Sequence, residues 1–179
     1  YLESIISESQ RLTHLITQVL NLERFESGKQ RLNITSVDLA ELIYKATKTF
    51  EGTIKQKNLE LKVDLMDSMM IIQCDKDLIY QVLINLIGNA IKFANHQIRI
   101  HTHFNNFEWQ VWISDDGKGV PIDIQSLIFD KFFQAKNQTL KKPEGSGLGL
   151  AICKKIIESH NGNIWIENIE SATGANFVF

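Results

Sequence analysis

The stretch QVLINLIGNAIKFA, residues 81–94, predicts a helix whose two faces differ in chemistry. At about 100° per residue, one arc collects the apolar side chains, those of Leu83, Leu86, Ile87 and Ala90. The opposite side collects Asn85, Asn89 and Lys92, each three or four residues from the next. Amide oxygens can ligate a hard cation, and a lysine can contact phosphate oxygens. We therefore predict that this helix holds a metal-bound phosphate; two asparagines on a merely exposed face are the alternative.

The composition of the 179 residues is that of an ordinary globular domain, with 44% hydrophobic and 22% charged residues. The net charge of −2 gives no reason to expect a nucleic acid or an anionic membrane as partner. Cys74 and Cys153 lie far apart, which favours reduced thiols and a cytoplasmic location. No apolar run approaches the ~20 residues of a membrane span. Because the chain begins at Tyr1 rather than Met, we expect a piece of a longer protein, whose missing part leaves room for a membrane anchor.

Residues 1–27 predict one long helix without glycine or proline. Its apolar positions form a stripe too wide for a helix lying on a single surface, namely Leu2, Ile5, Ile6, Leu12, Leu15, Ile16, Val19, Leu20, Leu22 and Phe25. At 1.5 Å per residue the helix would be roughly 40 Å long, more than a domain of this size can cover. We expect it to belong to a helical bundle with members outside this chain. An ordinary amphipathic helix packed on its own domain is the alternative.

The rest of the chain intersperses strands and helices. Alternating and short apolar runs predict strands over 33–36, 59–65, 69–74, 97–104, 108–114, 163–167 and 175–179. Helical spacing predicts helices over 36–57 and 147–159, besides the helix that contains residues 81–94. Ser36 is the expected N-cap of the first of these, and Asp75 or Asp77 is the expected N-cap of the helix that runs to residue 94. Since the strands occur largely in hairpin-like pairs, we predict an α+β fold, a two-layer sandwich of helices on a mixed β-sheet, rather than a doubly wound parallel fold.

The segment DDGKG, residues 115–119, directly follows a predicted strand. Glycines two residues apart allow a sharp turn and let a flat ligand approach the backbone without a Cβ in the way. A carboxylate at the end of a strand can accept a hydrogen bond from an exocyclic amine, which is one way of recognising adenine. By itself the segment is explained equally well by a plain turn.

The segment GSGLGL, residues 145–150, opens a predicted helix. Unhindered backbone N–H groups at a helix N-terminus form an anion site. The segment is not a Walker A loop, because the GK[ST] ending is missing. A dinucleotide fingerprint also fits poorly, since Leu150 stands at the third glycine position and no strand immediately precedes. The sequence therefore predicts a phosphate cradle of another kind.

Taken in order, the amide-bearing helix, DDGKG, IFDKFFQ (residues 128–134) and GSGLGL resemble the ATP-binding domain of sensor histidine kinases. That domain has a Bergerat-type fold shared with type II topoisomerases, mismatch-repair ATPases and heat-shock chaperones. The resemblance covers essentially residues 36–179, and it implies a kinase domain over 31–179 with a mobile lid at about 120–144. Residues 1–30 look like the second helix of the family's dimerisation and phosphoacceptor bundle, through which the intact protein would form a homodimer.

The resemblance implies roles for residues of the helix over 81–94. Asn89 matches the family's magnesium ligand, and Asn85 would be a second polar contact to metal or phosphate. Lys92 matches the lysine that reaches the phosphates, and Phe93 the aromatic residue that packs against adenine.

It also implies roles for the glycine segments. Asp115 matches the aspartate that receives the adenine amino group, with Gly117 and Gly119 shaping the pocket. The second glycine box, where the lid rejoins a helix, matches Gly145, Gly147, Leu148 and Gly149. The lid would be anchored by Phe129, Phe132 and Phe133.

Some residues depart from the family pattern. Lys131 replaces the usual proline of the IFDKFFQ box, and Gln134 replaces a frequent arginine, which weakens any phosphate contact from that segment. In the ATP-hydrolysing relatives a glutamate occupies the position of Asn85 and activates water. An amide is no general base at neutral pH, so Asn85 favours phosphoryl transfer over hydrolysis.

The implied function is that of a protein-histidine kinase using ATP and Mg²⁺. The γ-phosphoryl would pass to a histidine on a helix missing from this chain, and then to an aspartate of a response-regulator receiver domain. His14 lacks an acidic neighbour that could act as base, so it is a poor phosphoacceptor. An ATP-hydrolysing relative and a non-catalytic nucleotide-sensing module are the alternatives.

The remaining histidines have simpler explanations. His101 and His103 share a strand face, where they could bind a metal, but no third ligand is evident and surface positions explain them better. His160 is expected to cap a helix C-terminus as a cation.

Overall fold

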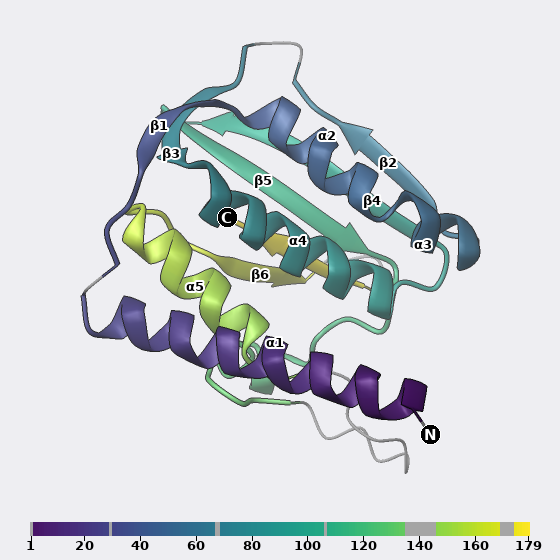
Figure 1. Ribbon diagram of the computed structural model, residues 1–179. Helices are drawn as coiled ribbons and strands as arrows, with labels where there is room; N and C mark the ends of the chain where they lie inside the picture. The colour runs from purple at the N-terminus through teal and green to yellow at the C-terminus, as the bar shows by residue number, and fades with distance from the viewer. Residues whose placement is uncertain (1, 29, 67–68, 106, 135–145, 169–173) are drawn as a thin grey trace.

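The computed structural model describes residues 2–28, 30–66, 69–105, 107–134, 146–168 and 174–179 (Figure 1). Its helices are α1 (Leu2–Glu26), α2 (Leu39–Thr49), α3 (Glu51–Gln56), α4 (Lys76–Phe93) and α5 (Gly149–Ser159), with a 3₁₀ helix at Ile122–Ile124. Its strands are β1 (Ile34–Asp38), β2 (Glu60–Asp64), β3 (Ile71–Asp75), β4 (Gln97–Asn105), β5 (Glu108–Asp115), β6 (Trp165–Asn168) and β7 (Ala175–Val178). None of the helices so described is long and apolar enough to cross a membrane.

The strands form a mixed five-stranded sheet in the order β2-β4-β5-β7-β6, and β1 and β3 form a separate antiparallel pair. β2 runs parallel to β4, and the other neighbours in the large sheet are antiparallel. Alternate residues such as Ile100, Ile113 and Phe177 are paired across the strands and buried on one face of the sheet. Helices α2, α4 and α5 cover that face (Figure 1), so the predicted two-layer α+β sandwich is confirmed.

The start of the second helix differs from the prediction. Ser36 was expected as its N-cap, but Ser36 pairs with Gln73 inside the β1–β3 ribbon. The cap is Asp38, whose carboxylate accepts hydrogen bonds from the N–H groups of Ala40 (2.9 Å) and Glu41 (3.3 Å). The predicted single helix over 36–57 is also wrong, because the chain leaves helical geometry at Phe50 and continues as α3. Ser36 is engaged in strand pairing, and the carboxylate of Asp38 two residues later caps the helix instead. The preference of serine for an N-cap position is therefore not realised here.

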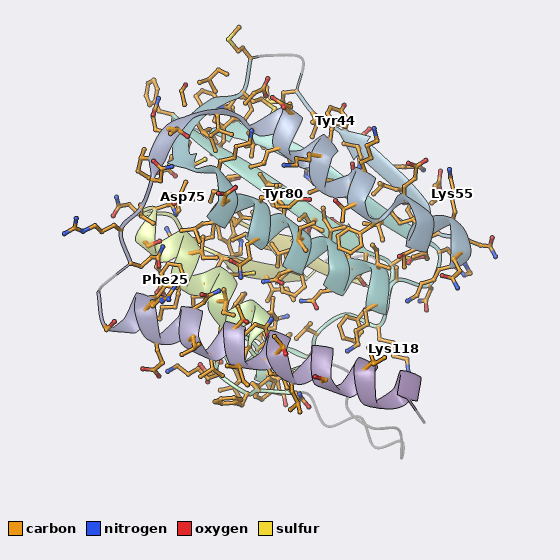
Figure 2. All side chains as sticks on the ribbon, viewed as in Figure 1. Phe25, Tyr44, Lys55, Asp75, Tyr80 and Lys118 are labelled. Atoms are coloured by element: carbon orange, nitrogen blue, oxygen red, sulfur yellow. The ribbon has the colours of Figure 1, made fainter. Side chains whose placement is uncertain are left out.

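Asp75 connects three parts of the fold at the start of α4 (Figure 2). One carboxylate oxygen accepts the N–H of Leu78 in the first turn of α4 (3.2 Å), so Asp75 is the N-cap and Asp77 is not. The other oxygen accepts the N–H of Asn33, just before β1 (2.9 Å). The N–H of Asp75 donates to Nε2 of His160 at the end of α5 (3.0 Å). One residue therefore fixes the start of α4 relative to β1 and to the end of α5.

The bond from Asp75 also defines the state of His160. A nitrogen that accepts a backbone N–H carries no proton, so the ring is neutral and its proton lies on Nδ1. Nδ1 then donates to the carbonyl of Ile156 (2.8 Å) in the last turn of α5. The predicted capping role is confirmed, but the predicted positive charge is wrong, because the backbone N–H of Asp75 donates to Nε2.

Helix α1 lies along α5 and uses one side of its wide apolar stripe for this contact (Figure 1). Leu22 is buried, and Phe25 packs partly buried against the same core. On the other side several large apolar side chains are exposed, those of Ile6, Leu12, Ile16, Val19 and Leu20. The domain therefore covers only part of the stripe, and the membership of α1 in a helical bundle stays a prediction.

We expect Asp75→Ala to lower the free energy of unfolding by about 1–3 kcal/mol, because the N-cap bond and the bond from Asn33 are both lost. Asp77→Ala, two residues along on an exposed position of the same turn, is the matched control and should stay within about 0.5 kcal/mol of wild type. Urea denaturation of the three proteins measures both values. Equal destabilisation by the two substitutions would contradict the capping assignment.

Candidate nucleotide-binding site

The two faces predicted for the helix over 81–94 are present in α4. Its buried face carries Ile79, Val82, Leu83, Leu86, Ile87, Ala90 and Ile91. Asn85 and Asn89 lie half-buried on the other side, and Lys92 and Phe93 are exposed near the C-terminal end. The ammonium of Lys92 lies 5.2 Å from the centre of the Phe93 ring, within the range of a cation–π contact. The predicted phosphate-facing residues therefore share one accessible side of the helix.

Asn85 makes a structural contact that the sequence did not reveal. Its amide nitrogen lies 3.4 Å from the carbonyl oxygen of Gly149 and 3.6 Å from Sγ of Cys153, both on α5. The NH₂ half of the amide thus ties α4 to the first turns of α5. The carbonyl half is the part of Asn85 that can act as a ligand.

Asp115 ends β5 with a buried carboxylate. Its Oδ1 accepts the N–H of Gly117 (2.9 Å). Burial raises the pKa of this carboxyl above its ordinary value, while hydrogen bonds from the N–H groups of Gly117 and Ala175 partly offset the shift. A buried acceptor of this kind suits a neutral hydrogen-bond donor such as an exocyclic amine.

Close backbone contacts around Asp115 require glycine at two positions. A Cβ on Gly117 would collide with the carbonyl oxygen of Phe93, at the end of α4, and with the Asp115 carboxylate. A Cβ on Gly174 would collide with the carbonyl oxygen of Asp115, and Gly174 has a φ of +141°. Gly174 also lies against Gly119, since a Cβ on Gly119 would be 2.7 Å from the Gly174 oxygen. Gly174 is a site residue that sequence reasoning missed; its place just before the last strand was the available signal.

Asp116 anchors the turn that follows α4, and its role was also missed. Its Oδ1 accepts the N–H groups of Asn95 (2.8 Å) and His96 (3.0 Å), and Nδ2 of Asn95 donates to its carbonyl (2.8 Å). Partial burial alone would raise the pKa of the Asp116 carboxyl, but the backbone donors of His96, Gln97 and Asn95 bring it below the ordinary value. The DDGKG segment is therefore held at the end of α4 by two contacts. Gly117 packs against the Phe93 carbonyl, and Asp116 accepts hydrogen bonds from Asn95 and His96.

The IFDKFFQ box contacts the second glycine box through its backbone. The N–H of Phe132 donates to the carbonyl of Gly147 (2.9 Å). Gly147 has a φ of +69°, and a Cβ there would be 2.8 Å from the backbone of Phe132. Phe129 is buried and meets Phe177 edge-on at 6.4 Å between ring centres, which anchors the box in the core. Gly145 and residues 135–144 of the predicted lid lie outside the described residues.

The predicted residues thus lie around the end of α4, the end of β5 and the start of α5, and α4 contacts both β5 and α5. Leu148 is buried immediately before α5, which begins at Gly149, two residues later than expected. Within the described part of the chain, no group of three or more His, Cys, Asp or Glu could hold a metal. Mg²⁺ usually takes several of its ligands from phosphate and water and few from the protein. Asparagine oxygens fit that arrangement.

The comparisons with known proteins agree with this fold. The family described as histidine kinase-, DNA gyrase B-, and HSP90-like ATPase matches residues 74–179. The alginate biosynthesis sensor protein KinB of Pseudomonas aeruginosa is 32% identical over 178 residues, which cover 98% of this chain and 29% of KinB. This relative therefore extends far beyond the segment that it shares with the chain.

Two solved structures support the same assignment. The catalytic domain of histidine kinase ThkA is 34% identical, with a TM-score of 0.72 over 82% of this chain and 93% of that domain. The structure of ThkA in complex with the response regulator protein TrrA gives 31% identity and a TM-score of 0.78, over 100% of this chain and 49% of that one. Fold and matches together define an ATP-binding domain of the gyrase, chaperone and kinase type. The chain belongs to the histidine kinase-, DNA gyrase B-, and HSP90-like ATPase family and, within it, to the catalytic domains of histidine kinases.

We expect Gly174→Ala to lower the free energy of unfolding by about 2 kcal/mol or more, because the added Cβ meets the Asp115 carbonyl in a backbone conformation that L-residues avoid. Gly52→Ala is the matched control, since a Cβ there meets nothing within 4 Å and the residue lies in α3. This control should be as stable as wild type or more stable by up to about 1 kcal/mol. Thermal unfolding measures both. A Gly174→Ala protein of unchanged stability would contradict the close contact.

Proposed function

We propose that this chain is the ATP-binding catalytic part of a sensor histidine kinase, and that Mg²⁺–ATP binds between α4, the end of β5 and the start of α5. The observation that carries the proposal is the common location of three kinds of group. These are the amide and lysine side chains of α4, the buried carboxylate of Asp115, and the glycine-flanked start of α5. The side chains of α4 suit the metal and the phosphates, and the carboxylate of Asp115 suits adenine. The start of α5 suits the phosphates.

On this proposal, Asn89 ligates the magnesium ion and the carbonyl of Asn85 faces the metal or phosphate. Lys92 binds phosphate oxygens, and Phe93 packs against adenine. Asp115 accepts the adenine amino group. The exposure of Phe93 and the burial of Asp115 support this division, since a stacking surface has to be open and a specific acceptor is strongest away from water.

The loop residues complete the pocket. Gly117 and Gly119 shape the adenine side, and Gly145, Gly147, Leu148 and Gly149 supply backbone N–H groups to the phosphates. When bound, Mg²⁺ would neutralise phosphate charge during an in-line phosphoryl transfer.

Asn85 favours transfer over hydrolysis. Its amide cannot remove a proton from water, and its NH₂ half faces α5. We propose that the phosphoryl group passes to a histidine outside this chain, because Leu15 and Ile16 follow His14 where an acidic neighbour would be needed. A receiver domain would accept it next, in keeping with the ThkA–TrrA complex.

We further propose a division into a bundle segment, residues 1–30, and a kinase domain, residues 31–179. The exposed apolar side of α1 supports a homodimer in which α1 packs with helices outside this chain. A cytoplasmic location follows from the proposed relay, since ATP and receiver domains are found there.

The metal assignment predicts that Asn89→Ala weakens binding of Mg²⁺–ATP by about ten- to hundredfold. Asn163→Ala, on an exposed residue before β6, is the matched control and should bind as wild type does. Calorimetric titration should be repeated with ATP in EDTA, where wild type and Asn89→Ala are expected to converge because the metal no longer contributes. Equal affinity of the two proteins for Mg²⁺–ATP would rule out Asn89 as a ligand.

The transfer assignment predicts that the chain binds γ-labelled ATP but stays unlabelled itself and releases phosphate slowly. Asn89→Ala serves as the background for phosphate release. Robust labelling at His14 would show that the acceptor lies within this chain. Sustained phosphate release with many turnovers would instead assign the protein to the hydrolysing branch of the family.

A further inference from the structure

The turn between β4 and β5 presents an aromatic ring to solvent. Phe107 is 95% exposed, and its backbone has a φ of +66°, a conformation that bulky L-residues rarely adopt. Asparagine or glycine would fit this turn with less strain and without exposing a ring. In a single copy of the chain Phe107 is therefore unfavourable on two counts, which indicates that the ring has a partner surface.

The neighbours of Phe107 extend this surface. Phe104 is also exposed, and its ring lies 4.9 Å from that of Trp109 across the hairpin, measured between ring centres. Glu108 is exposed beside the turn, and residues 101–110 contain no lysine or arginine. We call Phe104, Phe107 and Glu108 the hairpin tip. It is an apolar surface with negative charge at its edge.

A hollow of about 180 Å³ lies between α1, α5 and the IFDKFFQ box. Its buried lining is apolar and includes Leu22 and Phe129. Charged residues also line it, with three ammonium groups against one carboxylate, those of Lys131, Lys154, Lys155 and Asp130. Glu158 of the same helix lies 2.9 Å from Nζ of Lys155 and offsets part of this charge. The hollow is therefore apolar inside, and its edge carries more positive than negative charge.

The hairpin tip and the hollow are complementary in shape and in charge. A projecting aromatic ring can fill an apolar hollow, and the carboxylate of Glu108 can face the ammonium groups at the edge. Within one chain the two surfaces cannot meet. The turn between β4 and β5 lies beside β1 and β3, on the far side of the molecule from α1 (Figure 1). A second copy of the chain brings a hollow to the tip of the first.

We propose that copies of this chain associate head to tail, with the hairpin tip of one copy docked in the hollow of the next. The contact joins two different surfaces, so it continues into a row or closes into a ring instead of stopping at a two-fold pair. It leaves the exposed side of α1 uncovered and is therefore distinct from the proposed homodimer. One tip and one hollow make a small contact, which is weak between free molecules and effective where copies are held close together.

The test is sedimentation velocity of the chain between about 10 μM and 1 mM, the range of weak association. The mass of wild type should grow with concentration. Phe107→Asn removes the ring and suits the left-handed backbone, so it should fold as wild type does and associate about tenfold more weakly or less. Lys154→Glu reverses a charge of the hollow and should have a similar effect. Tyr44→Gln and Lys48→Glu, on exposed residues of α2, are the matched controls and should associate as wild type does.

A mixture of the two variants separates this contact from any other. Phe107→Asn keeps an intact hollow and Lys154→Glu keeps an intact tip, so the 1:1 mixture retains one working contact and should be larger than either variant alone. Circular dichroism checks that both variants are folded. A wild-type mass that stays constant with concentration would overturn the inference. So would association that persists in both variants, which would assign it to another surface such as the exposed side of α1, or a mixture no larger than its components.

Discussion

Asp115 ends β5 with a carboxylate that is 4% exposed, and a charged group is costly to bury unless donors surround it. The donors available here are backbone N–H groups, those of Gly117 and Ala175. To supply them, two loops have to approach the strand end more closely than any side chain would allow, which is why Gly117 and Gly174 stand there. The close approaches of Gly117 and Gly174 therefore serve one buried carboxylate, and the neighbouring Asp116 separately holds the turn after α4.

At the opposite end of α4, a single residue again makes several hydrogen bonds. Asp75 caps the helix and bonds Asn33, while its own N–H is accepted by His160. Midway along, the Asn85 amide joins α4 to the start of α5. Polar contacts thus hold both ends of α5 against α4, and the apolar faces between the helices supply the burial. The arrangement fixes the start of α5 relative to α4.

The segment just before α5 is held differently. Gly147 is fixed by Phe132 from the IFDKFFQ box, and Ser146 is fixed by Gln18 from α1. The first contact belongs to the domain itself, whereas the second comes from a helix whose other side carries exposed apolar residues.

Periodicity along the chain determined the long helix, the two faces of α4 and the α+β sandwich, because burial of one face imposes a repeat that can be read locally. Ordered boxes likewise identified the family, and the nucleotide-binding residues that they imply stay a prediction. Tertiary structure decided the rest. Ser36 became a strand residue because β3 offered it a partner, and His160 became neutral because Asp75 supplied a donor. Gly174, Asp116, Ser146 and Gln18 gained roles through contacts between segments far apart in sequence, and such contacts leave no local pattern. Hydrophobic repeats act over a few residues, whereas close approaches and hydrogen-bond partners exist once the chain has folded.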